Sequence, residues 1–206
     1  CGYMIVDVDG VRGGYEAAGD GPPLVLLASP VARAKSYRRT ASSLGRAFRV
    51  YTVELPGSGR ADPIGPGWSV GRYAEWVNGF VDTLGLARPV VVGHSHAGPI
   101  AVVLAARHPE AVGRLVLVDA TGTGPHPAVR VFTAGAIDLA REFEVVPARW
   151  QHVLGNLVRH PRNFIRQVCG ALAADVRADA ARVAAPALVA WGGRSLAFPP
   201  RHAREY

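Results

Sequence analysis

Short unbroken apolar runs, separated by segments with helical periodicity, limit what this chain can fold into more than any other feature. Strands that are buried on both faces of a parallel sheet have this appearance in a sequence. The alternation predicts an α/β fold with a mostly parallel sheet and right-handed crossovers. The strand-like runs are residues 24–27, 49–53, 90–92, 115–118 and 187–191.

The N-terminal part of the chain predicts an antiparallel hairpin instead. Residues 3–8 and 11–16 are rich in β-formers and flank Asp9-Gly10, a dipeptide that favours a tight hairpin turn. Helical patterns then follow the strand-like runs, and Ser69 is placed to cap the second helix. The expected helices are residues 34–48, 70–84 and 96–107.

The alternation stops between Thr121 and Ala185, where helical patterns continue and no convincing strand occurs. The expected helices there are residues 147–157, 161–172 and 175–183. We therefore predict a core of residues 1–120, an inserted helical lid of residues 121–185, and a return to the core at residues 186–206.

Composition excludes several classes of function. The 206 residues carry a formal net charge of +7, but Lys35 is the only lysine and the arginines are scattered, so no nucleic-acid partner is predicted. No apolar run approaches the ~20 residues of a membrane span, and no phosphate-loop or dinucleotide motif indicates a cofactor.

Two cysteines, Cys1 and Cys169, build no disulfide framework or metal site, and Cys169 is expected to be a buried small hydrophobe. No signal peptide is visible, so a cytoplasmic location is expected.

The stretch most informative about chemistry runs from Gly93 to Ala97, between a buried strand and an Ala-rich helix. It has the small-x-Ser-x-small layout of a nucleophile elbow, in which crowding around a strained serine requires small residues two positions away. Ser95 is thus the candidate nucleophile, and the backbone N–H of His96 the candidate oxyanion donor. The side chains of His94 and His96 are expected to point away from the hydroxyl. The alternative interpretation is an ordinary strand-to-helix turn with a capping serine.

At these residues the chain resembles the α/β-hydrolase fold family, and further blocks follow in the family's order. They are residues 20–27, 54–62, 107–110, 115–119 and 185–192, so the resemblance covers nearly the whole chain. It implies an α/β-hydrolase fold in which Ser95 attacks the carbonyl of a small or medium apolar ester or lactone. It implies no cofactor and no metal.

Two departures from the family pattern affect the catalytic groups. The third family strand usually ends in His-Gly, whereas here Ala28-Ser29-Pro30 follows it. Pro30 then occupies the second oxyanion position without an N–H to donate, which leaves the Val31 N–H or the Ser29 hydroxyl as substitutes. The usual acid position holds Ser195. Asp119, after the sixth family strand, is the candidate acid, and a structural role at a strand end is its alternative.

The catalytic histidine of the family follows one further strand, and we expect that strand and its histidine loop to lie beyond Tyr206. The seven histidines of this chain are expected to have surface or packing roles. The chain alone should then show little turnover. In the lid, Phe132, Trp150 and Leu154 are candidate substrate-binding residues. A second hypothesis is a non-catalytic or non-hydrolytic family member that binds a small apolar ligand.

Overall fold

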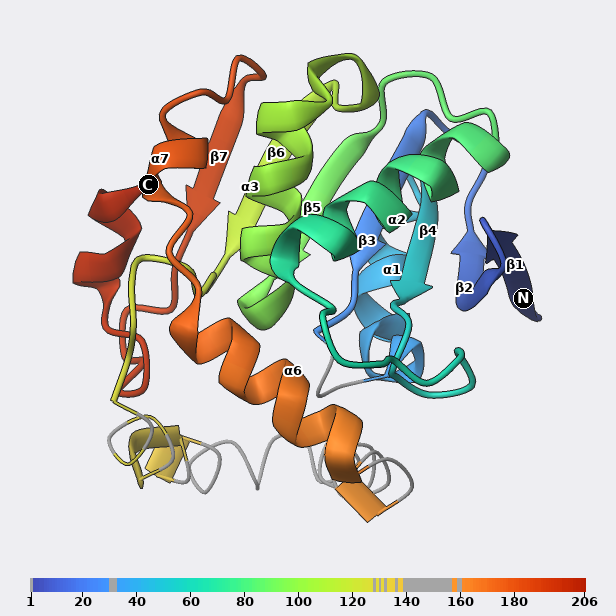
Figure 1. Cartoon of the computed structure of the whole chain (residues 1–206). Helices are drawn as coiled ribbons and strands as arrows, with labels where there is room; N and C mark the ends of the chain where they lie inside the picture. The colour runs from blue at the N-terminus through green and yellow to red at the C-terminus, as the bar shows by residue number, and fades with distance from the viewer. Residues whose placement is uncertain are drawn as a thin grey trace.

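A seven-stranded sheet in the order β1-β2-β4-β3-β5-β6-β7 forms the centre of the molecule (Figure 1). The computed structural model describes residues 2–29, 33–127, 129, 131, 133–135, 137–138, 157–158 and 161–206. The β1–β2 and β2–β4 pairs are antiparallel, and all later pairs in the order are parallel, so the predicted sheet and N-terminal hairpin are confirmed. The strands are β1 Tyr3–Val8, β2 Val11–Ala18, β3 Pro23–Leu27, β4 Arg49–Glu54, β5 Val90–His94, β6 Arg114–Val118 and β7 Ala187–Ala190.

Helices cover both faces of the sheet, with α2 and α3 on one face and α1 on the other (Figure 1). Ser69 caps α2 as predicted, because its side chain accepts the Arg72 N–H at 3.2 Å. None of the helices that the structure describes is long and apolar enough to cross a membrane. The helices are η1 Ala34–Tyr37, α1 Arg38–Leu44, α2 Val70–Thr83, η2 Ser95–Ala97, α3 Gly98–Arg107, η3 Pro109–Ala111, α6 Pro161–Ala173, α7 Arg177–Ala180 and η4 Pro200–Glu205.

Some predicted helix boundaries were wrong. The helix expected over residues 34–48 consists of a short 3₁₀ segment, η1, and a separate α1 that ends at Leu44. The helix expected over residues 175–183 is limited to α7, which is four residues long. The helix expected over residues 161–172 is confirmed as α6, while most of residues 147–157 lies outside the described residues.

The side chains of β3 alternate between two buried faces of the sheet, which explains why its sequence is an unbroken apolar run. Val25 and Leu27 join the large core cluster under α2 and α3, whereas Leu24 and Leu26 pack in a smaller cluster with Ala41 of α1. Because both faces are covered, every position from 24 to 27 is buried. Parallel pairing of Leu27 with Gly93 places the carboxyl end of β3 next to the carboxyl end of β5.

The described part of the predicted lid contains the helices α6 and α7, and α6 lies beyond the carboxyl ends of the parallel strands (Figure 1). Buried Gln167 of α6 anchors it to the core, because its Nε2 lies 3.2 Å from the Pro56 carbonyl oxygen and 3.1 Å from the Tyr73 hydroxyl. Burial raises the pKa of Tyr73 to about 12, so this hydroxyl keeps its proton and donates to the same Pro56 oxygen at 3.1 Å. Cys169, also on α6, is exposed rather than buried, so that expectation was wrong.

Close approach of β5 and α3 gives a first prediction. A Cβ added at Gly93 would lie 2.8 Å from the Ala101 Cβ and 2.8 Å from the Gly98 Cα. Gly93→Ala should therefore lower the free energy of unfolding by about 1–3 kcal/mol, as overpacking does. The matched control is Gly65→Ala, where a new Cβ meets nothing within 4 Å and the change should stay within about 0.5 kcal/mol. Urea denaturation of the two variants beside the parent chain measures the difference, and equal effects would contradict the crowding.

Candidate active site

Ser95 stands at a sharp turn between β5 and α3, as the elbow pattern predicts. It directly follows the last residue of β5 and adopts a φ of +54°, in the left-handed region that non-glycine residues seldom occupy. Such strain persists only where the surrounding structure fixes it. Here β5 is buried on one side of the turn and α3 on the other, and the Thr121 N–H donates to the Ser95 carbonyl oxygen at 3.2 Å.

Strand register brings three polar side chains to one end of the sheet. Leu27 of β3 pairs with Gly93 of β5, so Ser29 and Ser95 each lie two residues beyond a paired position. On the other side of β5, His94 pairs with Val118 of β6, which makes Asp119 level with Ser95. Open α/β sheets bind ligands in the crevice at the carboxyl ends of their strands. The sequence-predicted nucleophile and candidate acid are therefore on neighbouring strands at that end.

The side chain of His96 does not point away from the hydroxyl, so the expectation for this residue was wrong. Its Nδ1 lies 3.0 Å from Ser95 Oγ. Burial, with a smaller contribution from neighbouring His94, lowers the pKa of His96 to about 4, so the ring is neutral at pH 7 and its Nδ1 can accept the hydroxyl proton in a hydrogen bond. A base with so low a pKa is weak, so this contact orients Ser95 more than it activates it.

Asp119 fastens the loop after β7 to the strand ends. Its φ is +44°, its N–H donates to the Ala190 carbonyl oxygen at 3.0 Å, and its Oδ1 accepts the Gly192 N–H at 2.7 Å. Among the described residues no histidine contacts its carboxylate. Ser195, at the usual acid position of the family, accepts the Phe198 N–H at 3.3 Å and so stabilises the turn after β7.

Several predicted site residues fall outside the described residues: Pro30, Val31, Phe132, Trp150 and Leu154. Of the histidines that follow β6, His202 of η4 lies 3.2 Å from the Thr123 hydroxyl and 3.2 Å from a carboxylate oxygen of Glu205. Its ring also packs edge-on against His126, with centroids 5.0 Å apart. His202 therefore contacts Thr123, Glu205 and His126, and its surface or packing role stays a prediction.

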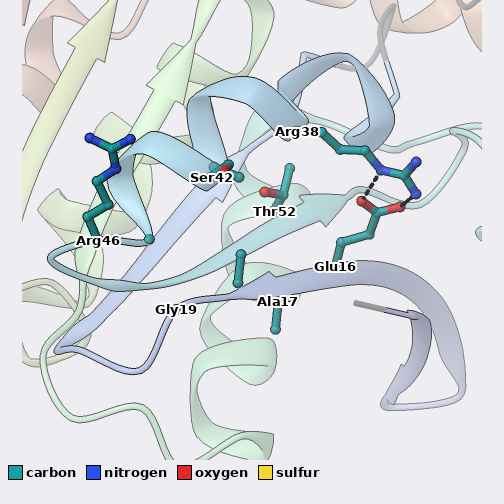
Figure 2. Close-up of a pocket in the computed structure, with 10 residues that line it drawn as sticks. Glu16, Ala17, Gly19, Arg38, Ser42, Arg46 and Thr52 are labelled. Carbon is teal, nitrogen blue, oxygen red and sulfur yellow. Dashed lines mark hydrogen bonds and ion pairs between the residues drawn. The ribbon is translucent and has the colours of Figure 1, made fainter.

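Two cavities occur away from the Ser95 hydroxyl. The larger, of about 660 Å³, lies between α2, α3, α6 and α7, and its wall includes Trp68, His96 and Ile100 but not Ser95. The smaller, of about 340 Å³, lies between β2 and α1, where Figure 2 shows Arg38 paired with Glu16. His96, which lines the larger cavity, connects it to the elbow through its contact with the Ser95 hydroxyl.

Comparison with known proteins decides the family. The sequence profile described as alpha/beta hydrolase fold matches residues 22–135. The chain belongs to the α/β-hydrolase fold family. It is 30% identical over 224 aligned positions to a 2-hydroxy-6-oxononadienedioate/2-hydroxy-6-oxononatrienedioate hydrolase of Burkholderia vietnamiensis, covering 92% of this chain and 77% of that protein. The resemblance that the sequence motifs suggested is thus confirmed.

A solved α/β-hydrolase structure supports the same assignment. The enol-lactonase of Burkholderia xenovorans LB400 superposes with a TM-score of 0.84 and 25% identity, covering 98% of this chain and 86% of the enzyme. An uncharacterized protein of Mycobacterium tuberculosis is 31% identical over 115 residues, covering 56% of this chain and 34% of that protein. The chain spans less than half the length of several curated relatives that it matches.

The low pKa of His96 predicts a pH-dependent stability. An unfolded histidine has a pKa of about 6.5, so the unfolded chain binds a proton at this residue below that pH. In the folded protein His96 binds the proton only near pH 4, so lowering the pH favours the unfolded state. Between pH 7 and pH 5 the parent chain should therefore lose up to about 2 kcal/mol more unfolding free energy than His96→Gln, which cannot be protonated. Guanidinium denaturation of both proteins at the two pH values measures this, and identical losses would show that His96 titrates normally.

Proposed function

We propose that the protein is a serine hydrolase that cleaves small or medium apolar esters or lactones, with Ser95 as its nucleophile. The observation that carries the proposal is the left-handed backbone of Ser95 at the junction of a buried strand and a helix. A serine strained in this way holds its hydroxyl at the carboxyl end of the sheet, where a substrate carbonyl can approach. An ordinary capping serine has no need of this conformation, since N-caps adopt extended backbone.

The proposed first step forms a bond between Ser95 Oγ and the carbonyl carbon. The carbonyl π electrons move onto the oxygen, and the Ser95 proton passes to a general base. The His96 N–H lies in the first turn after β5, where backbone donors lack an intrahelical acceptor, so it can donate to the new oxyanion. Collapse of the tetrahedral species expels the alcohol, which takes the proton from the base, and water then hydrolyses the acyl-enzyme by the same route.

The proposed base is a histidine beyond Tyr206, in the order typical of the family, and the proposed acid is Asp119. With Oδ1 held by the Gly192 N–H, Asp119 Oδ2 would accept the imidazole N–H and orient the ring. The Val31 N–H near Pro30 remains a candidate second oxyanion donor. Phe132, Trp150 and Leu154 remain candidates for the lining of the substrate pocket.

The names of relatives support a small substrate, because one is a hydrolase of an oxo-dienedioate and another is an enol-lactonase. A cytoplasmic location stays a prediction from the sequence.

A second candidate function is that of a non-catalytic family member that keeps a ligand pocket. The contact of Ser195 with the Phe198 N–H supports it, because the residue at the usual acid position then stabilises a turn instead of orienting a catalytic histidine.

Hydrolysis of p-nitrophenyl butyrate by the 206-residue chain tests the proposal. We expect a slow rate, because loss of a triad leaves only a residual ~10³–10⁴-fold acceleration over water. Added imidazole, as a substitute base, should raise the rate in a saturable manner. Ser95→Ala should show only the reaction of imidazole with free ester. Rates that are equal in the two proteins at every imidazole concentration would contradict a nucleophilic Ser95 and favour the non-catalytic candidate.

A further inference from the structure

The hydroxyl of Ser29 is buried and has no hydrogen-bond partner among the residues that the structure describes. Ser29 is only 2% exposed, so its side chain lies inside the protein rather than at the surface. Leaving a buried hydroxyl unpaired costs free energy, which is why the large majority of such groups in native structures are paired. The unpaired hydroxyl of Ser29, at a strand end on the strand next to that of Ser95, therefore needs a physical explanation.

Ser29 occupies a position suited to the reaction proposed for Ser95. It follows β3 at the level of Ser95 on the adjacent strand, because Leu27 pairs with Gly93. The next residue is Pro30, which has no backbone N–H to offer an oxyanion. The Ser29 side chain thus supplies an O–H donor at the sheet edge where the following backbone position cannot supply an N–H.

Tyr37 fixes Ser29 relative to the elbow. The Tyr37 hydroxyl accepts the Ser29 N–H at 3.0 Å and lies 2.8 Å from His94 Nδ1. Which of the two groups donates depends on the tautomer of His94, the residue directly before Ser95. The Tyr37 and His94 rings also pack edge-on, with centroids 5.6 Å apart. One side chain therefore joins the segment after β3 to the end of β5.

We propose that the Ser29 hydroxyl is the second oxyanion donor of this site and that Tyr37 positions it. This inference rests on the proposed function. As the bond from Ser95 Oγ to the carbonyl carbon forms, the carbonyl oxygen gains the electron pair and accepts hydrogen bonds from the His96 N–H and the Ser29 O–H. No proton leaves Ser29, and the Ser95 proton goes to the imidazole base as before. A donor without a partner among the described residues breaks no hydrogen bond to another residue when it donates to the developing charge.

Ser36 provides a matched control. Its Oγ is also buried without a partner among the described residues, but it belongs to η1 rather than to the segment that directly follows β3. Replacement of either serine by alanine removes an unpaired hydroxyl, so neither variant should lower the denaturant midpoint. Of these two alanine variants, only Ser29→Ala should lower the rate of the Ser95-dependent reaction.

The test is imidazole-supported hydrolysis of p-nitrophenyl butyrate by the parent chain, Ser29→Ala, Ser36→Ala and Tyr37→Phe, at a temperature where all are folded. Ser29→Ala should lower the Ser95-dependent kcat about 100-fold with KM nearly unchanged, as expected for a donor used only in the transition state. Tyr37→Phe should lower kcat about 10-fold, because misplacement of the donor weakens the same contact. Ser36→Ala should match the parent chain.

The outcomes distinguish failure of the Ser29 role from failure of the proposed function. A Ser95-dependent parent rate that Ser29→Ala leaves unchanged overturns the role of Ser29 while the proposed function stands. A parent rate equal to that of Ser95→Ala overturns the proposed function, and the role of Ser29 with it. A loss of kcat in Ser29→Ala that comes with an equal loss in Ser36→Ala, or with a lower denaturant midpoint, shows a structural effect and also overturns the oxyanion role.

Discussion

The site depends on the close contact between β5 and α3, which forces the backbone at Ser95 into the left-handed region. Gly93 allows this contact, since a side chain there would lie 2.8 Å from the Ala101 Cβ and 2.8 Å from the Gly98 Cα. Gly98 allows a second close approach, to the segment after β6, since a side chain there would lie 2.3 Å from the Ala120 Cβ. Because the strand is buried and the helix begins within three residues, the turn has no room to relax. The strain at Ser95, with φ of +54°, is thus maintained by the packing of the core rather than by any single hydrogen bond.

A buried carboxylate also holds the segment that follows β3 in place. Glu54, 1% exposed at the end of β4, accepts the Ala34 N–H at 2.9 Å and the Tyr3 hydroxyl at 2.8 Å. Burial and the negative charge of Glu54 raise the pKa of Tyr3, so the tyrosine stays protonated and donates. The bond to Ala34 holds the start of η1, and η1 ends at Tyr37. Hydrogen bonds therefore connect the hairpin, β4 and η1 to Ser29 and His94.

Much of the fold could be predicted from the sequence, because doubly buried strands and the elbow at Ser95 depend on local patterns of apolar and small residues. The sequence also placed Asp119 at a strand end. It could not show that His96 turns toward Ser95, because that contact depends on the rotamer that His96 adopts in the turn. Nor did it indicate Tyr37 or Gln167, which are polar only at their tips and contact residues far along the chain. The exposure of Cys169 was missed because the expectation rested on the general preference of free cysteine for burial, whereas Cys169 lies outside the face of α6 on which Val168 and Leu172 are buried.

Covalent labelling tests the central claim, a nucleophilic Ser95, most directly. Cells that naturally make the protein are treated with a fluorophosphonate probe, and the labelled protein is digested and its adduct located by tandem mass spectrometry. The structure predicts a single adduct on Ser95, which disappears when the cells are first treated with an unlabelled fluorophosphonate. An unlabelled protein in a lysate where other serine hydrolases carry the probe, or an adduct on a different serine, would contradict it.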